Sequence, residues 1–194
     1  MKLTFKKMIK HFLLVCRHKS EVFKNCLRCG IPFRGLVHDL SKFSPSEFFE
    51  SARYYQGNRS PIAVCRANEG KSLAWLHHKG INRHHIEYWH DEDCAVHPMM
   101  PYKYAVECIC DKLAATKTYA DGKYAPDMPI KHWIKYGSRA ACNPKTRAFI
   151  EKVFKDLSLH GDDFVLNSKY MKATYKEICL DGETVPRPEE ELPL

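Results

Sequence analysis

Apolar side chains recur every three or four residues through the first part of the chain, which is the spacing of one face of an α-helix. The pattern predicts a helix over residues 3–29, and Gly30 followed by Pro32 ends it. His11 and His18 lie seven positions apart within this helix, so we expect them on roughly one face.

The same spacing predicts helices along the rest of the chain. A short helix is expected over residues 36–42, and the capping box from Ser44 to Glu47 begins a third helix that Gly57 stops. Residues 82–89 fit a short helix or a loop, and 91–101 fit a loop. The further predicted helices cover 61–68, 72–78, 102–120, 129–136, 144–159 and 168–178.

Strand-like alternation of apolar and polar positions is absent from the sequence, so the predicted fold class is all-α. We expect one domain over residues 1–180, built as a bundle of seven or eight helices. The proline- and glutamate-rich residues 181–194 are expected to form a loose tail. With 194 residues, of which 44% are hydrophobic, the chain is long enough to bury a core.

Charge and cysteine content narrow the function classes. The net charge of +8 favours an acidic partner such as a nucleotide, a phosphate ester or nucleic acid, although a basic solvated surface has the same signature. Nine irregularly spaced cysteines indicate reduced thiols in the cytoplasm, and the Cys26-x-x-Cys29 pair lacks a second pair to complete a zinc knuckle. The sequence has neither a secretory signal nor an 18-residue apolar run, so we expect no membrane partner.

Histidine and aspartate carry the most specific chemistry, because imidazole and carboxylate are the ligands that Zn, Fe, Mn and Co accept. His38 and Asp39 are adjacent, and on a helix end both side chains can turn toward one ion. The remaining candidates are His18, the pairs His77-His78 and His84-His85, and Asp111.

Each candidate has an alternative interpretation. His11 competes with His18 as a ligand, and His38-Asp39 is also compatible with a self-capping helix end. Asp111 stands in an apolar run, where a carboxylate needs an ion, or a salt bridge to Lys112 or Lys117. Helical spacing makes His77 co-facial with His84, and His78 with His85, so it does not say which two of the four are ligands.

The order His, His-Asp, paired histidines and distant Asp resembles the HD-domain superfamily of helical metalloproteins. The resemblance implies an HD-like bundle in which His18, His38, Asp39 and Asp111 bind metal. His78 and His85 are then second-metal ligands, with His77 and His84 as their competitors. Lys42 follows Asp39 as in the HDxxK form, in which the lysine faces substrate phosphate.

A closer resemblance covers about residues 10–157. The strings HDLSKFSPSEF, YYQGNRSP, WLHHKGINRHHIEYW and MPYKYAVECICDKL are similar to a bacterial and phage family of unknown function, which implies a cytoplasmic protein. The glycine-rich tripeptide of cyclic-di-nucleotide phosphodiesterases does not follow the histidine pairs, so cyclic di-GMP is not the expected substrate.

These observations predict a metal-dependent phosphohydrolase that acts on a nucleotide or related phosphate ester. One or two divalent ions (Mn, Fe, Zn, Co or Mg) would activate water. Asp39 and Lys42 are the predicted catalytic residues, and Lys42, Lys79 and Arg83 the predicted phosphate ligands. The alternatives are a di-iron oxygenase with a similar ligand set, and a non-catalytic protein that binds nucleotides or nucleic acid.

Overall fold

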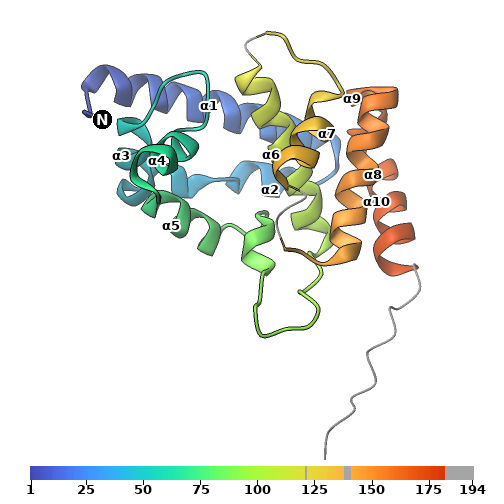
Figure 1. Ribbon diagram of the computed structural model, residues 1–194. Helices are drawn as coiled ribbons and strands as arrows, with labels where there is room; N and C mark the ends of the chain where they lie inside the picture. Colours follow the sequence, from blue (N-terminus) through green and yellow to red (C-terminus); the bar gives the residue numbers. More distant parts are fainter. Residues whose placement is uncertain (121, 138–140, 182–194) are drawn as a thin grey trace, which may run out of the picture.

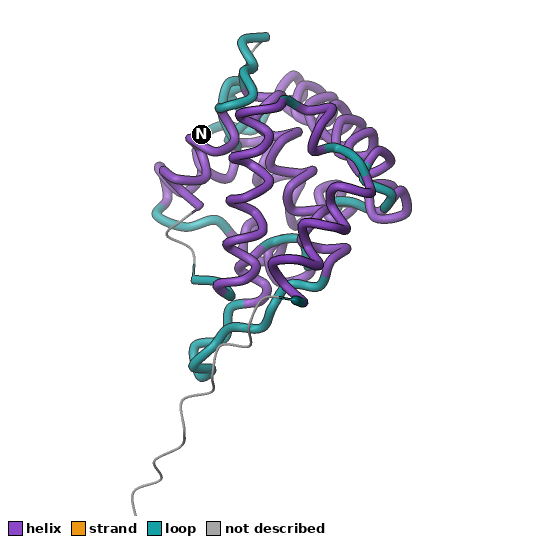
Figure 2. Tube along the Cα trace, turned by 90° about the vertical axis from the view of Figure 1, so that its right-hand side faces the viewer, coloured by secondary structure: helices purple, strands orange, loops and turns teal. Residues whose placement is uncertain are grey.

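The computed structural model describes residues 1–120, 122–137 and 141–181, and within these ranges it contains α-helices and no strand (Figure 2). The all-α prediction is therefore confirmed. The described elements, in chain order, are α1 (Phe5–Arg28), α2 (Pro32–Val37), η1 (Leu40–Phe43), α3 (Pro45–Arg53), α4 (Pro61–Glu69), α5 (Leu73–Ile81), η2 (Ile86–Trp89), α6 (Tyr102–Tyr119), α7 (Met128–His132), η3 (Trp133–Gly137), α8 (Pro144–His160), α9 (Asp162–Val165), α10 (Ser168–Tyr175) and η4 (Lys176–Leu180).

Local sequence signals fix the helix ends that position the site. Thr4 caps α1 by accepting a hydrogen bond from the Lys7 backbone N–H at 3.3 Å, and Ser72 caps α5 by accepting one from Trp75 at 3.1 Å. Gly30 ends α1 in the left-handed conformation, with φ of 76°.

Helix α6 is the centre of the molecule. Ten of its residues are buried, and it packs against α1 and against α8. In Figure 1, α3, α4 and α5 lie on one side of α6, and α8, α9 and α10 lie on the other. The aromatic core beside α8 contains Trp133, Phe149 and Phe154, each at most 1% exposed. The aromatic core therefore occupies the α8 side of α6, and the polar residues described below lie on the side that faces α3 to α5.

The predicted helix over residues 36–42 is wrong, because the chain breaks at the His-Asp pair. Helix α2 ends at Val37, and His38 takes an extended ψ of 128°. Asp39 has a φ of 51°, the only positive φ at a non-glycine position among the described residues. In a continuous helix adjacent side chains point about 100° apart. The break lets both side chains turn toward the same interior point, at the cost of strained backbone.

The capping box at Ser44 is only half present. Ser44 is the N-cap of α3 and Pro45 occupies the first turn, as the sequence predicts, but the Ser44 side chain makes no capping hydrogen bond. The Glu47 carboxylate turns away to bond His77 and His78. Glu47 therefore binds two histidines instead of capping the helix.

The helix count differs from the predicted seven or eight, since the described ranges contain ten α-helices. The additional ones are short. Helix α2 replaces the predicted 36–42 helix, and α9 is a four-residue turn. The predicted 129–136 and 168–178 helices each begin as α-helix and finish as a π-helical turn. The predicted tail lies, apart from Asp181, outside the described residues.

Candidate metal centre

Seven of the predicted ligands converge from four parts of the chain. α1 supplies one histidine, the break between α2 and η1 supplies the His-Asp pair, and α6 supplies an aspartate. The rest come from α5 and the turn after it. The converging residues are His18, His38, Asp39, His78, His84, His85 and Asp111.

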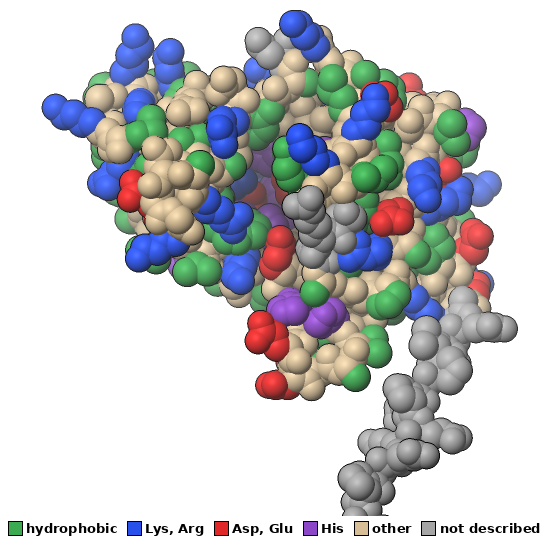
Figure 3. Space-filling model, in the orientation of Figure 1, with side chains coloured by type: hydrophobic (Ala, Val, Ile, Leu, Met, Phe, Trp, Pro, Cys, Tyr) green, Lys and Arg blue, Asp and Glu red, His purple; other side chains and the backbone are tan. Residues whose placement is uncertain are grey.

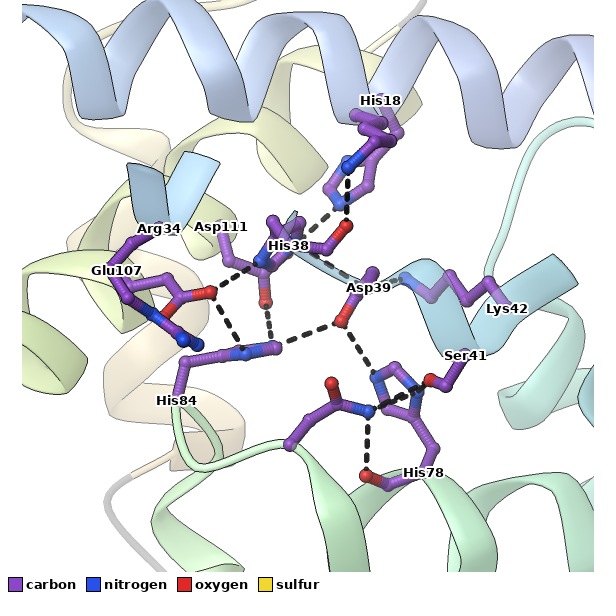
Figure 4. A network of polar contacts seen from close by, with 12 residues as sticks. His18, Arg34, His38, Asp39, Ser41, Lys42, His78, His84, Glu107 and Asp111 are labelled. Atoms are coloured by element: carbon purple, nitrogen blue, oxygen red, sulfur yellow. Dashed lines mark hydrogen bonds and ion pairs between the residues drawn. The ribbon is translucent and has the colours of Figure 1, made fainter. Parts of the chain in front are cut away.

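Asp39 stands at the centre of this cluster, 2% exposed, and divides it in two (Figure 4). Its Oδ2 lies 3.3 Å from His38 Nε2, on the side of His18 and Asp111. Its Oδ1 lies 3.4 Å from both His78 Nε2 and His84 Nε2. One group of donors is therefore His18, His38, Asp39 and Asp111, and the other is Asp39, His78, His84 and His85.

Several of the donor atoms face one another without hydrogen-bond partners, whereas His18 Nε2 and Asp111 Oδ1 are hydrogen-bonded to each other. The buried atoms without such a partner include Nε2 of His38, His84 and His85 and Oδ1 of Asp39, whereas Oδ2 of Asp39 lies 2.6 Å from Lys42 Nζ. Buried polar atoms are normally paired, and leaving them unpaired costs roughly 1–3 kcal/mol each. Ligands held at about 2.1 Å from one ion lie roughly 3.0–3.4 Å apart. The donor separations of 3.3 and 3.4 Å fit that arrangement, so the residues present fit a pair of divalent ions bridged by Asp39.

Two buried glutamates orient the histidines. His38 Nδ1 lies 3.0 Å from Glu107 Oε1, and His78 Nδ1 lies 2.7 Å from Glu47 Oε2. A carboxylate at Nδ1 holds the N–H there and leaves the Nε2 lone pair free. His84 has a similar orientation without a hydrogen bond, its Nδ1 lying 3.5 Å from Glu107 Oε1. All three rings therefore present Nε2 to Asp39.

The electrostatics match a site that accepts cations. Burial alone would raise the pKa of Asp39 and of Asp111. His38 and Lys42 outweigh burial at Asp39 and hold its pKa well below the usual range. Hydrogen bonds from His18 and His38 do the same for the pKa of Asp111. Burial also lowers the pKa of His84 to about 4, so this imidazole is neutral at pH 7. Ionised carboxylates and neutral imidazoles are the protonation states that metal binding requires.

His38 behaves differently from the other histidines. Burial opposes its protonation, but the charges of Asp39, Asp111 and Glu107 prevail and raise its pKa well above the usual value. The excess negative charge around His38 thus favours the protonated imidazole in the absence of another cation. A divalent ion placed between the same carboxylates supplies that charge instead.

Lys42 also reaches the centre. Its Nζ lies 2.6 Å from Asp39 Oδ2, and its side chain is 25% exposed, so Lys42 connects the buried cluster with the protein surface. Burial opposes the charged form, but Asp39 and Asp111 outweigh it and raise the pKa of Lys42. Lys42 therefore keeps its charge at neutral pH.

Four sequence candidates stay outside the cluster. His77 bonds Glu47 at 2.7 Å and is 42% exposed. Arg83 lies against the rings of Tyr88 and Tyr104, 5.6 and 5.9 Å from their centres. Within the described ranges, neither Lys79 nor Arg83 makes a hydrogen bond or ion pair with a clustered donor. His11 packs on Phe48 instead, with ring centres 5.3 Å apart.

The helical-spacing argument for the histidine pairs fails because α5 ends at Ile81. The following turn brings His84 and His85 both into the cluster, with ring centres 4.2 Å apart. The alternative partners of Asp111 are also settled by geometry. Asp111 Oδ1 lies 2.9 Å from His18 Nε2, while Lys117 pairs with Asp162. The nine cysteines form no disulfide.

Sequence reasoning missed Glu47 and Glu107. Glu107 lies one turn before Asp111 on the same face of α6, inside the apolar run that singles out Asp111, and it is fully buried. The argument that a carboxylate in an apolar run needs a partner applies equally to both. Glu47 carried no comparable signal, since its position in a capping box offered an ordinary explanation.

Comparison with known families places residues 7–156 in one of them. The chain belongs to the family of unknown function DUF5662. The expected resemblance of residues 10–157 to such a family is therefore confirmed, and the matched range includes all seven clustered donors. No curated protein and no solved structure matches the chain. A search of the described helices finds none long and apolar enough to cross a bilayer.

Proposed function

We propose that this member of DUF5662 is a metal-dependent phosphohydrolase that acts on a nucleotide or a related phosphate ester. The observation that carries the proposal is the pair of donor groups that share Asp39, one carboxylate oxygen for each. Two ions bridged by one carboxylate clamp both the attacking and the leaving oxygen of a phosphoryl group. The order of ligands resembles the HD superfamily, which supports the same activity.

The residues divide into two ligand sets. His18, His38 and Asp111 would hold one ion, and His78, His84 and His85 would hold the other, with Asp39 common to both. When bound, such ions supply a water of lowered pKa and neutralise phosphate charge. Glu47 and Glu107 keep the imidazoles in the tautomer that presents Nε2.

Lys42 is the positively charged side chain that would contact the substrate phosphate. Its ammonium is held at Asp39 and its side chain is a quarter exposed, so we expect a phosphate oxygen at this edge of the site to accept one of its three N–H groups. Charge that develops on that oxygen in the transition state strengthens the contact. A cation at this place favours an anionic substrate, and it has no comparable role in oxidising a neutral C–H bond.

Two measurements on one preparation test the proposal. Elemental analysis of protein purified without chelator should find up to two transition-metal ions per chain. A phosphate-release screen over nucleoside mono-, di- and triphosphates and sugar phosphates should find turnover that chelator abolishes. A screen without turnover, together with a mixed-valent di-iron signal in electron paramagnetic resonance, would instead establish the oxygenase alternative.

A further inference from the structure

A cavity of about 240 Å³ lies beside the metal centre, between α4 and α5 on one side and α6 and α7 on the other. Trp75 forms part of its wall, and the Trp75 ring also lies 5.0 Å from the ring of His85. In Figure 3 the front face of the molecule is hollowed near its middle, with histidine and acidic side chains visible inside the hollow and basic side chains around it. Trp75 thus contacts both the cavity and the cluster.

Two cations face this cavity from opposite walls. Arg66 of α4 lies over Trp75, with the guanidinium carbon 4.8 Å from the ring centre. Lys112 of α6 lies over Trp133, with Nζ 5.4 Å from the ring centre. Within residues 1–120, 122–137 and 141–181, neither makes an ion pair. Indole faces hold a cation in place without neutralising it.

The other polar groups of the cavity leave this positive charge in excess. Among the described lining residues Glu87 is the one acidic side chain, against the two cations Arg66 and Lys112. Burial and the charge of Lys112 lower the pKa of His132, so its imidazole is neutral at pH 7. A concave site with net positive charge and aromatic walls concentrates organic anions.

We propose that this cavity binds a second anionic group of the substrate, a phosphate or carboxylate, between Arg66 and Lys112. This inference rests on the proposed function, in which the first phosphate lies at the metals. Lys112 directly follows Asp111, and Ile86, which also lines the cavity, directly follows His85. A ligand in the cavity is therefore next to the metal centre. The substrate class is a phosphate ester with two separate anionic groups.

The tryptophans provide the assay. The chain has three, and Trp75 and Trp133 both line the cavity, so Trp89→Phe leaves two reporters there, of which Trp133 lies on the wall away from His85. Metal-free Trp89→Phe protein is titrated with inorganic phosphate at constant ionic strength. We expect a saturable change in tryptophan emission with a midpoint in the millimolar range. Phosphate bound at the metals is excluded by chelation.

In the same background, Arg66→Met and Lys112→Met should each raise the midpoint at least tenfold, and Lys112→Arg should restore it. Lys71→Met, an exposed lysine between α4 and α5, is the matched control and should leave the midpoint unchanged. Arg66 is exposed, so Arg66→Met carries the test even where Lys112→Met fails to fold.

A linear response to phosphate, or one midpoint shared by all variants, would overturn the inference. That result leaves the proposed function untouched, because turnover is measured separately in the phosphate-release screen. Conversely, a saturable response that depends on Arg66, in a protein that releases no phosphate, would establish the anion site and reject the hydrolase.

Discussion

Glu107 Oε1 lies 3.0 Å from His38 Nδ1, and neither side chain is exposed to solvent. Because this contact fixes the tautomer of His38, Glu107→Gln should lower metal affinity roughly 10- to 100-fold, the range found when partners of metal-bound histidines are changed. Competition with a chromogenic chelator measures the affinity. Glu21→Gln, on the surface of α1, is the control, and equal affinity in both variants would show that Glu107 does not orient the ligand.

If Asp39 divides the cluster into two metal sites, the number of bound ions per chain should depend on which donor is replaced. Asp111→Asn and His78→Ala should each lower the content by about one ion per chain, whereas Asp39→Asn should lower both sites together. Asn is the appropriate replacement because it tolerates the left-handed backbone of Asp39 better than Ala does. Inductively coupled plasma mass spectrometry measures the content. Full stoichiometry in Asp39→Asn would show that this carboxylate does not bridge two ions.

Metal removal should lower thermal stability, because an ion bound only by the folded state stabilises it by mass action. At a free metal concentration of about 100 times the dissociation constant the gain is roughly 2.7 kcal/mol, which is about 5–10 °C in a domain of this size. Differential scanning calorimetry with and without chelator measures the shift. Asp39→Asn should show none, and an equal shift in this variant would place the metal elsewhere.

Lys42→Met should keep its metal and lose activity. The variant removes the ammonium that lies at Asp39 and leaves every donor in place. We expect a fall in kcat of about a hundredfold on the identified phosphate substrate, the scale of one lost transition-state contact. Lys79→Met is the matched comparison and should change kcat less, because Lys79 makes no ion pair with the clustered donors in the described ranges. Wild-type turnover in Lys42→Met would show that Lys42 only neutralises Asp39.

His11 should make stability depend on pH. Burial, and to a smaller degree the charge of Lys42, lower its pKa from 6.5 to about 4, and both ring nitrogens lack a hydrogen-bond partner. Between these two values the unfolded chain takes up a proton at His11 that the folded chain does not, so stability falls as pH falls from 6.5 toward 4. At pH 5 the contribution is about 2 kcal/mol.

His11→Phe removes this titration and suits a pocket that already contains Phe48 and Tyr55. Urea unfolding at pH 7.5 and pH 5.0 should show the variant gaining stability relative to the wild type at the lower pH. An unchanged difference between the two proteins at both pH values would mean that His11 titrates normally in the folded state.

The sequence allowed prediction of the helices and most of the cluster, because helical periodicity and the scarcity of carboxylates in apolar runs are local signals. It did not allow prediction of the break at His38-Asp39, whose left-handed backbone is stabilised by contacts with residues far along the chain. The turn that brings in both His84 and His85 depends likewise on where α5 stops. Glu47 was misassigned because its position in the sequence fits a capping box, whereas its carboxylate in the structure bonds His77 and His78.

The backbone of Asp39 has a consequence for how this family can diverge. At a φ of 51°, glycine and asparagine are the replacements that fit with little strain, and neither carries a charge. A lineage can therefore lose this carboxylate, the proposed bridge between two ions, in one substitution that the backbone tolerates. If the proposed function holds, relatives with Asn or Gly at this position are expected to be folded proteins without metal-dependent activity, and this one residue would distinguish them in a sequence.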